Sequence, residues 1–168
     1  MLRKTAPVLC VLVVFALLAS CGTTDPNATS SEDLSSYETW TKVNDETITG
    51  DATGTLGQQV HEGAGGFREV FVNSVGEPVF AGEASTPFPV GTIIVKESYP
   101  DAGGSKGDLS TLTVMVKREA GYDADNGDWE WVMLGPDMGI RTQGALASCY
   151  QCHAVAADTD YSFLAGDI

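Results

Sequence analysis

The residues with the clearest chemistry form the run Cys149-Tyr150-Gln151-Cys152-His153, near the C-terminal end of the chain. Two thiols at this spacing lie on one side of a helical turn, so both can form thioether bonds with the vinyl groups of one haem. The histidine that follows can then bind the haem iron as an axial ligand. The motif therefore predicts one covalently attached haem c, held by Cys149 and Cys152, with His153 on the iron.

Three other interpretations compete with haem attachment. A thioredoxin-like redox pair would open a helix after a strand of a βαβ unit, and the sequence shows no such pattern. A zinc site needs three or four protein ligands, whereas the only other histidine in the sequence is His61. A chance match is the third. It is weakened by a signal for export, because haem is attached to such motifs outside the cytoplasm.

The export signal lies in the first 20 residues. A basic head over 1–4 precedes an apolar run over 6–18, which is shorter than the ~20 residues of a membrane-spanning helix. Residues 18–21 resemble a bacterial lipobox, in which cleavage leaves Cys21 as an acylated N-terminus. We therefore expect a signal peptide over 1–20 and a lipid anchor on Cys21. The protein would face the periplasm from the bacterial cell envelope, at the outer membrane or the outer leaflet of the inner membrane. An ordinary secretory signal is the alternative.

Acidic residues dominate the charge of the chain. The sequence has 9 basic and 23 acidic residues and a formal net charge of -14 at pH 7. Removal of residues 1–20 takes away Arg3 and Lys4 and leaves seven basic residues, which lowers the net charge to -16. Such a chain repels phosphate backbones, so we expect no nucleic-acid partner. The charge would suit a basic redox partner, such as a periplasmic electron acceptor, although solubility is its simplest role.

The length of 168 residues suits one domain. Residues 21–36 are polar, lack apolar periodicity and predict a flexible tether, followed by a haem domain over 37–168. Tyr37 and Trp40 share a helical stripe, which predicts one or two helical turns. Strands are predicted at 67–73, 90–97, 109–117 and 129–134, and a short helix at 144–156. The fold class is thus α+β, mainly β. An antiparallel sheet has short helices at both ends, and the C-terminal helix carries the haem motif.

Two-residue alternation divides the residues of each predicted strand between its two faces. In the strand at 90–97, one face carries Thr92, Ile94 and Lys96, and the other carries Ile93, Val95 and Glu97. In the strand at 109–117, one face carries Leu112, Val114 and Val116, and the other carries Thr113, Met115 and Lys117. In the strand at 129–134, Trp129, Trp131 and Met133 share a face.

No good sixth ligand for the iron is visible. Only 15 residues follow His153, and none is methionine. Met115 and Met133 fall within predicted strands and Met138 in a Gly-rich turn, so we expect all three to pack rather than to bind iron. His61 is expected to be an ordinary loop histidine. The sequence therefore favours a five-coordinate iron with an open face for small diatomic or nitrogen-oxide ligands.

The sequence resembles the cytochrome P-460 family, which includes the β-sheet cytochromes c-prime. The resemblance runs from 37 to about 163 and includes the haem motif. It further rests on these segments: Tyr37-x-x-Trp40, Phe67-Arg68-Glu69-Val70-Phe71-Val72-Asn73, Gly91-Thr92-Ile93-Ile94-Val95-Lys96-Glu97, Val114-Met115-Val116-Lys117, Gly127-Asp128-Trp129 and Asp160-Tyr161-Ser162-Phe163.

The resemblance implies a mainly antiparallel β fold, commonly a homodimer, with a five-coordinate haem. In the P-460 members a lysine is covalently linked to the porphyrin rim, and Lys96 occupies the matching place. The alternative is that Lys96 extends into solvent or pairs with a haem propionate. Members that oxidise hydroxylamine carry a glutamate as a proton acceptor, and the matching position here is Thr113. A threonine hydroxyl is no base near neutral pH, which puts fast hydroxylamine oxidation in doubt.

Three functions follow as hypotheses. The first is oxidation of hydroxylamine or nitric oxide, with electrons passed to a periplasmic acceptor. The second is non-catalytic binding or scavenging of nitric oxide or carbon monoxide, and the third is plain electron transfer. A second motif, 123–128, is similar to the start of a calcium loop, but position twelve is Leu134 rather than a glutamate. We interpret it as a turn between strands.

Overall fold

The computed structural model describes residues 28–30, 33–44, 48–49 and 66–163. The predicted signal peptide, the lipidation site Cys21 and His61 lie outside these residues, and their interpretations stay predictions. Within the described ranges, no helix has the length and apolar character needed to cross a membrane.

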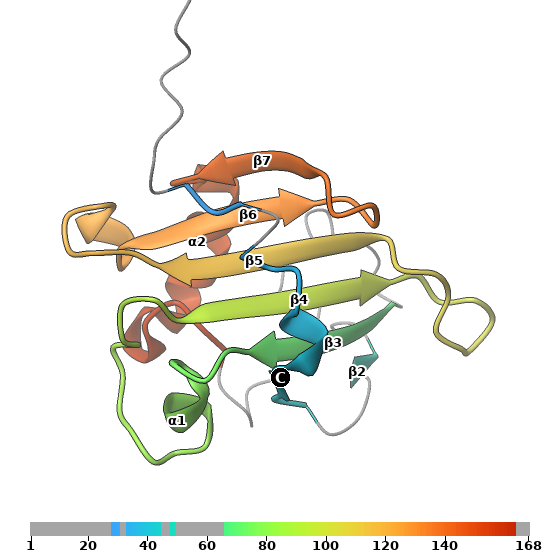
Figure 1. Ribbon diagram of the computed structural model, residues 1–168, viewed down its shortest axis with the longest axis horizontal. Coiled ribbons are helices and arrows are strands. Elements are labelled where there is room, and N and C mark those ends of the chain that lie inside the picture. The colour runs from blue at the N-terminus through green and yellow to red at the C-terminus, as the bar shows by residue number, and fades with distance from the viewer. Residues whose placement is uncertain (1–27, 31–32, 45–47, 50–65, 164–168) are drawn as a thin grey trace, which may run out of the picture.

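One antiparallel sheet of seven strands forms the body of the described chain (Figure 1). The strand order is β1-β3-β4-β5-β6-β7, and β2 pairs with β3 beside β1. The bounds are β1 Thr41–Lys42, β2 Ile48–Thr49, β3 Phe67–Val72, β4 Ile93–Tyr99, β5 Thr111–Lys117, β6 Trp129–Leu134 and β7 Ile140–Gly144. The predicted α+β class with a mainly antiparallel β architecture is confirmed.

Short helices flank the sheet. They are the 3-10 helix η1 Tyr37–Thr39, α1 Glu77–Phe80, the 3-10 helix η2 Ala124–Asn126, α2 Ala147–His153 and the 3-10 helix η3 Ala154–Thr159. In Figure 1, η1 lies in front of the sheet and α2 behind it. The haem motif therefore sits on a helix that covers one face of the sheet, as predicted.

The alternation of side chains along the strands builds a separate core on each face. The core on the η1 face consists of Leu34, Tyr37, Phe71, Val95, Leu112, Val114, Val116, Val132 and Leu134. The core on the α2 face consists of Val70, Val72, Val79, Phe88, Ile94, Met115, Trp129, Trp131 and Cys149. Within β4, β5 and β6 the two sets match the alternation predicted for each strand, and the pairing of the strands brings these faces together.

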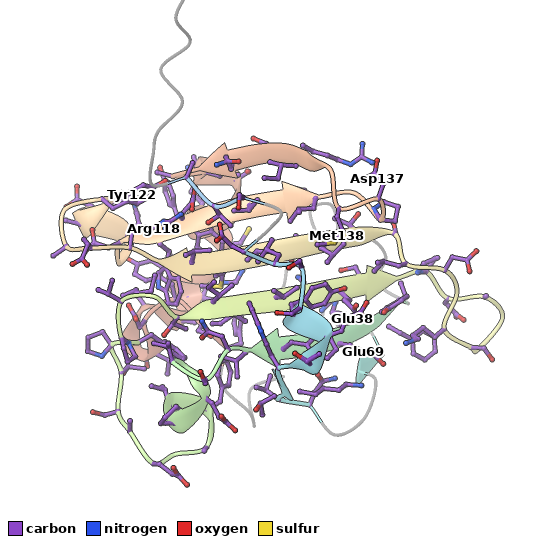
Figure 2. The ribbon with its side chains drawn as sticks, in the orientation of Figure 1. Glu38, Glu69, Arg118, Tyr122, Asp137 and Met138 are labelled. Carbon is purple, nitrogen blue, oxygen red and sulfur yellow. The ribbon has the colours of Figure 1, made fainter. Side chains whose placement is uncertain are left out.

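Two buried carboxylates on the η1 face, Glu97 and Glu130, are satisfied by side-chain donors. The Glu97 carboxylate accepts hydrogen bonds at 2.6 Å from Tyr37 and at 2.6 Å from Tyr99. Glu130 accepts a hydrogen bond from the Thr29 hydroxyl at 2.7 Å and pairs with Arg118. Figure 2 shows Arg118 on this near side of the sheet.

Two residues from the segment expected to be a tether belong to the packed body. Thr29 and Leu34 are only 5% and 0% exposed, because both are covered against the sheet. The folded body thus includes residues before Tyr37.

The strand boundaries differ from prediction where turns intervene. β4 begins at Ile93 rather than at 90, because Val90 and Gly91 form a turn. Gly91 has φ +87°, a conformation that favours glycine, and its N–H donates to the Lys117 carbonyl at 2.9 Å. The edge strand β7 and the four-residue helix α1 were not predicted, because neither carries a clear apolar period.

The core on the η1 face yields a stability prediction. Leu112 lies on the central strand β5 and is fully buried. Leu112→Ala removes its packing and leaves a cavity, so we expect the free energy of unfolding to fall by about 2–5 kcal/mol in denaturant titrations. Val155→Ala is the control and should change it by less than about 0.5 kcal/mol, since Val155 is 69% exposed. Equal effects from the two variants would contradict the assigned core.

Candidate functional site

A cavity lies on the α2 face of the sheet. Its floor is formed by residues of β3, β4, β5 and β6, and α2 and Phe163 form part of its wall. The cavity holds about 950 Å³ when its open mouth is included. Sites for small molecules and cofactors have mostly apolar linings, as this cavity does.

The two motif cysteines line this cavity from α2. Cys149 is buried and Cys152 is exposed, and both are free thiols. Burial raises the pKa of the Cys149 thiol, so it is protonated near neutral pH. The helix predicted for this region thus brings both sulfurs to one cavity wall.

His153 is held in a defined orientation at the end of α2. Its Nδ1 lies 2.7 Å from the Tyr161 carbonyl oxygen. A carbonyl only accepts, so Nδ1 carries the proton and donates, and Nε2 keeps its lone pair. The ring contacts Trp131, at 4.6 Å between centroids, and Phe163, at 5.3 Å. Burial lowers the pKa of His153 to about 4, which keeps the imidazole neutral and able to bind a metal.

Lys96 and Thr113, predicted separately, are direct neighbours on the cavity floor. The register pairs Lys96 of β4 with Thr113 of β5, and Thr113 with Met133 of β6. All three residues line the cavity. The sheet therefore brings the predicted cross-linking lysine and the predicted distal residue into one row.

Lys96 lies near a second basic residue, Arg68, and both line the cavity. Burial is the main cause that holds the pKa of the Lys96 amine well below its ordinary value, and the nearby Arg68 guanidinium acts in the same direction. A lowered pKa favours the neutral amine, which is a nucleophile. Lys96 lines the cavity, and the cross-link to haem and its two alternatives, extension into solvent or a pair with a haem propionate, stay predictions.

Among the lining residues that were not predicted as part of the site, Arg68 and Trp131 can donate hydrogen bonds. Arg68 is only 6% exposed and comes from β3. Trp131 was predicted only as a face residue, yet its buried Nε1 has no hydrogen-bond partner among the described residues. A buried N–H of this kind marks a place where a bound group can accept a hydrogen bond. No carboxylate side chain is found among the described residues that line the cavity.

The three methionines take different places. Met138 packs against the core on the η1 face, away from the cavity, and Figure 2 shows it on the near side of the sheet. Met115 belongs to the core of the α2 face and also lines the cavity, as Met133 does. Packing is thus confirmed for Met138 and Met115. Met133, whose side chain ends in a thioether, is a residue of the cavity floor.

The residues present fit a haem. The apolar lining suits a porphyrin ring, and the two thiols and the neutral imidazole lie at one wall. Arg68, Lys96 and the unpartnered Trp131 N–H are donors of the kind that carboxylate groups, such as haem propionates, accept from. The donor set therefore matches what c-type attachment requires.

The segment 123–128 forms a turn between β5 and β6, as interpreted from sequence. Asp128 turns its carboxylate inward and accepts from the Gly121 and Asp123 N–H groups, at 3.0 and 2.9 Å. Within the part of the chain that the structure describes, no cluster of three or more acidic, His or Cys side chains is arranged to hold a metal ion.

Comparison with known proteins agrees with this site. A search of curated proteins finds no match. The family model for Cytochrome P460 matches residues 34–164, which include every cavity residue named above. This match covers most of the chain and confirms the resemblance drawn from sequence. The chain therefore belongs to the cytochrome P460 family and is a c-type haem protein.

Proposed function

We propose that this protein is a lipid-anchored mono-haem cytochrome that faces the periplasm and binds small diatomic or nitrogen-oxide ligands at an open iron site. The observation that carries the proposal is the set of groups at one wall of the cavity. Cys149 and Cys152 line it with free thiols, and His153 carries its proton on Nδ1, which donates to the Tyr161 carbonyl, so Nε2 has the lone pair that a metal ligand needs. A bound haem supplies iron that binds small ligands and changes oxidation state.

The protein's own residues have distinct roles in this proposal. Cys149 and Cys152 hold the cofactor covalently, and His153 offers Nε2 as the axial ligand. The Trp131 and Phe163 rings both contact the imidazole and restrict its rotation. The largely apolar lining offers water few hydrogen-bond partners, which strengthens the polar contacts that remain.

Ligand binding is favoured over oxidation because the described lining offers no carboxylate. Oxidation of hydroxylamine requires a group that takes up protons, and the Thr113 hydroxyl is too weakly basic for this role. It can still donate a hydrogen bond to a small ligand or to water. Lys96 supports oxidation as the second candidate, since its amine lies in the cavity with a lowered pKa.

The cellular context extends the proposal. Acylation of Cys21 would tie the protein to the outer membrane, or to the outer leaflet of the inner membrane. A periplasmic electron acceptor would exchange electrons with the haem, and a homodimer would be the assembled form. The strongly negative net charge of the chain supports a basic partner rather than nucleic acid.

Covalent attachment is tested by denaturing the purified protein. We expect protein made with haem-attachment machinery to keep one haem, seen in its mass and in the spectrum of the pyridine adduct. Cys149→Ser combined with Cys152→Ser should release all haem, because both thioethers are lost. Gln151→Ala, on the exposed surface of the same helix, is the control and should keep it. Colourless wild-type protein with both thiols free would refute the proposal.

Proteolytic digestion of the same haem-loaded protein tests whether Lys96 is covalently linked to the haem. A peptide with Lys96 joined to the haem peptide identifies it as a covalent attachment. Separate peptides identify it as a non-covalent partner of the cofactor.

Coordination at rest is tested by absorption spectroscopy of the ferric protein. We expect a high-spin spectrum and, after reduction, binding of carbon monoxide and nitric oxide, because no protein ligand fills the sixth position. Met133→Leu should leave the resting spectrum unchanged, and so should the control Met138→Leu on the opposite face. A low-spin spectrum that becomes high-spin only in Met133→Leu would instead support an electron carrier.

The role assigned to Thr113 is tested by hydroxylamine turnover. We expect slow oxidation by the wild type and a rise in Thr113→Glu toward the roughly 100-fold contribution of a general base. Thr113→Gln is the matched control, since it has the shape of glutamate without its basicity. Equal rates in both variants, or fast turnover by the wild type, would show that Thr113 does not limit the reaction.

A further inference from the structure

The carbonyl that orients His153 belongs to a backbone turn of unusual conformation. Asp160 and Tyr161 have φ +58° and +63°, so two consecutive non-glycine residues are left-handed. This region is unfavourable for L-residues, and for a bulky aromatic residue it is rare. Such a turn persists only where its surroundings hold it.

A buried ion pair holds the first residue of the turn. Lys117 Nζ lies 2.7 Å from each oxygen of the Asp160 carboxylate, and both side chains are less than 10% exposed. The same carboxylate accepts the Phe88 N–H at 2.8 Å, and the Asp160 carbonyl accepts the Trp129 indole N–H at 2.8 Å. Three separate elements thus converge on Asp160.

Further contacts hold the second residue of the turn. The Tyr161 hydroxyl donates to the Asp125 carbonyl at 3.0 Å, and its N–H donates to the Ala156 carbonyl at 2.8 Å. A Cβ at Gly127 would lie 2.8 Å from the Tyr161 ring, so only glycine leaves room for that ring here. The Lys117 ammonium also donates to the Gly127 carbonyl at 2.7 Å. Lys117 thus connects the ion pair at Asp160 with the glycine that contacts the Tyr161 ring.

We propose that Asp160, held by Lys117 and Trp129, is a positioning residue that sets the strength of the bond between His153 and the haem iron. The ion pair fixes the left-handed turn, the turn fixes the Tyr161 carbonyl, and that carbonyl accepts the Nδ1–H of His153. A well-aligned acceptor on Nδ1 increases the basicity of Nε2. This inference rests on the proposed function, because it takes His153 as the axial ligand.

The test compares variants of the haem-loaded protein by two measurements. Resonance Raman spectra of the ferrous protein report the iron–histidine stretching frequency, and titration reports the reduction potential. In Asp160→Asn we expect a lower stretching frequency and a higher potential, because a misplaced carbonyl weakens the donation from Nδ1. Glu130→Gln is the control: it disrupts the other buried ion pair, with Arg118 on the opposite face, and should leave both quantities unchanged.

Trp129→Phe keeps the proposal testable if Asp160→Asn does not fold. It removes only the indole donor to the Asp160 carbonyl, so we expect a smaller shift in the same directions. Unchanged frequency and potential in the folded variants would overturn the inference, and so would equal shifts in Glu130→Gln. If wild-type protein with attached haem shows no iron–histidine band, the proposed function fails at His153 instead, and the variants are not needed to show it.

Discussion

The site depends on the register between β4 and β5. Side chains alternate between the faces of a sheet, so a slip by one residue would turn every side chain of a strand to the other side. In the observed register, Lys96 faces Thr113 and both line the cavity, while Glu97 and Leu112 are paired on the η1 face. The core on that face makes a slip costly, since Leu112 and Val95 are fully buried there.

The division of the strand residues between two faces was predictable because it depends only on local alternation. Lys96, Thr113 and Trp131 were each assigned to a face of their own strand, whereas the pairing between strands that brings all three to the cavity was not predicted. The C-terminal helix was predicted from its motif, and β6 was predicted with its observed bounds. The edge strand β7 was missed because Ile140 is its only large apolar residue and no apolar alternation follows it.

The contacts of His153 could not be predicted from the sequence, for a different reason. Its partner on Nδ1 is a backbone carbonyl, and backbone carbonyls carry no sequence signal. The Asp160 carboxylate is satisfied by groups 43 and 72 positions away, at Lys117 and Phe88. Such long-range contacts appear in no local pattern. Arg68 was missed likewise, because a charged residue on a strand is usually solvent-exposed.

The row of Lys96, Thr113 and Met133 bears on how the function of such a protein can evolve. These three side chains belong to the cavity floor, and none of them is part of the core on the η1 face. Substitution within the row therefore leaves that half of the apolar interior intact. One sheet can thereby acquire a base, a metal ligand or an inert lining at adjacent positions. Ligand-binding proteins and enzymes can therefore diverge on the same fold while the core on the η1 face is unchanged.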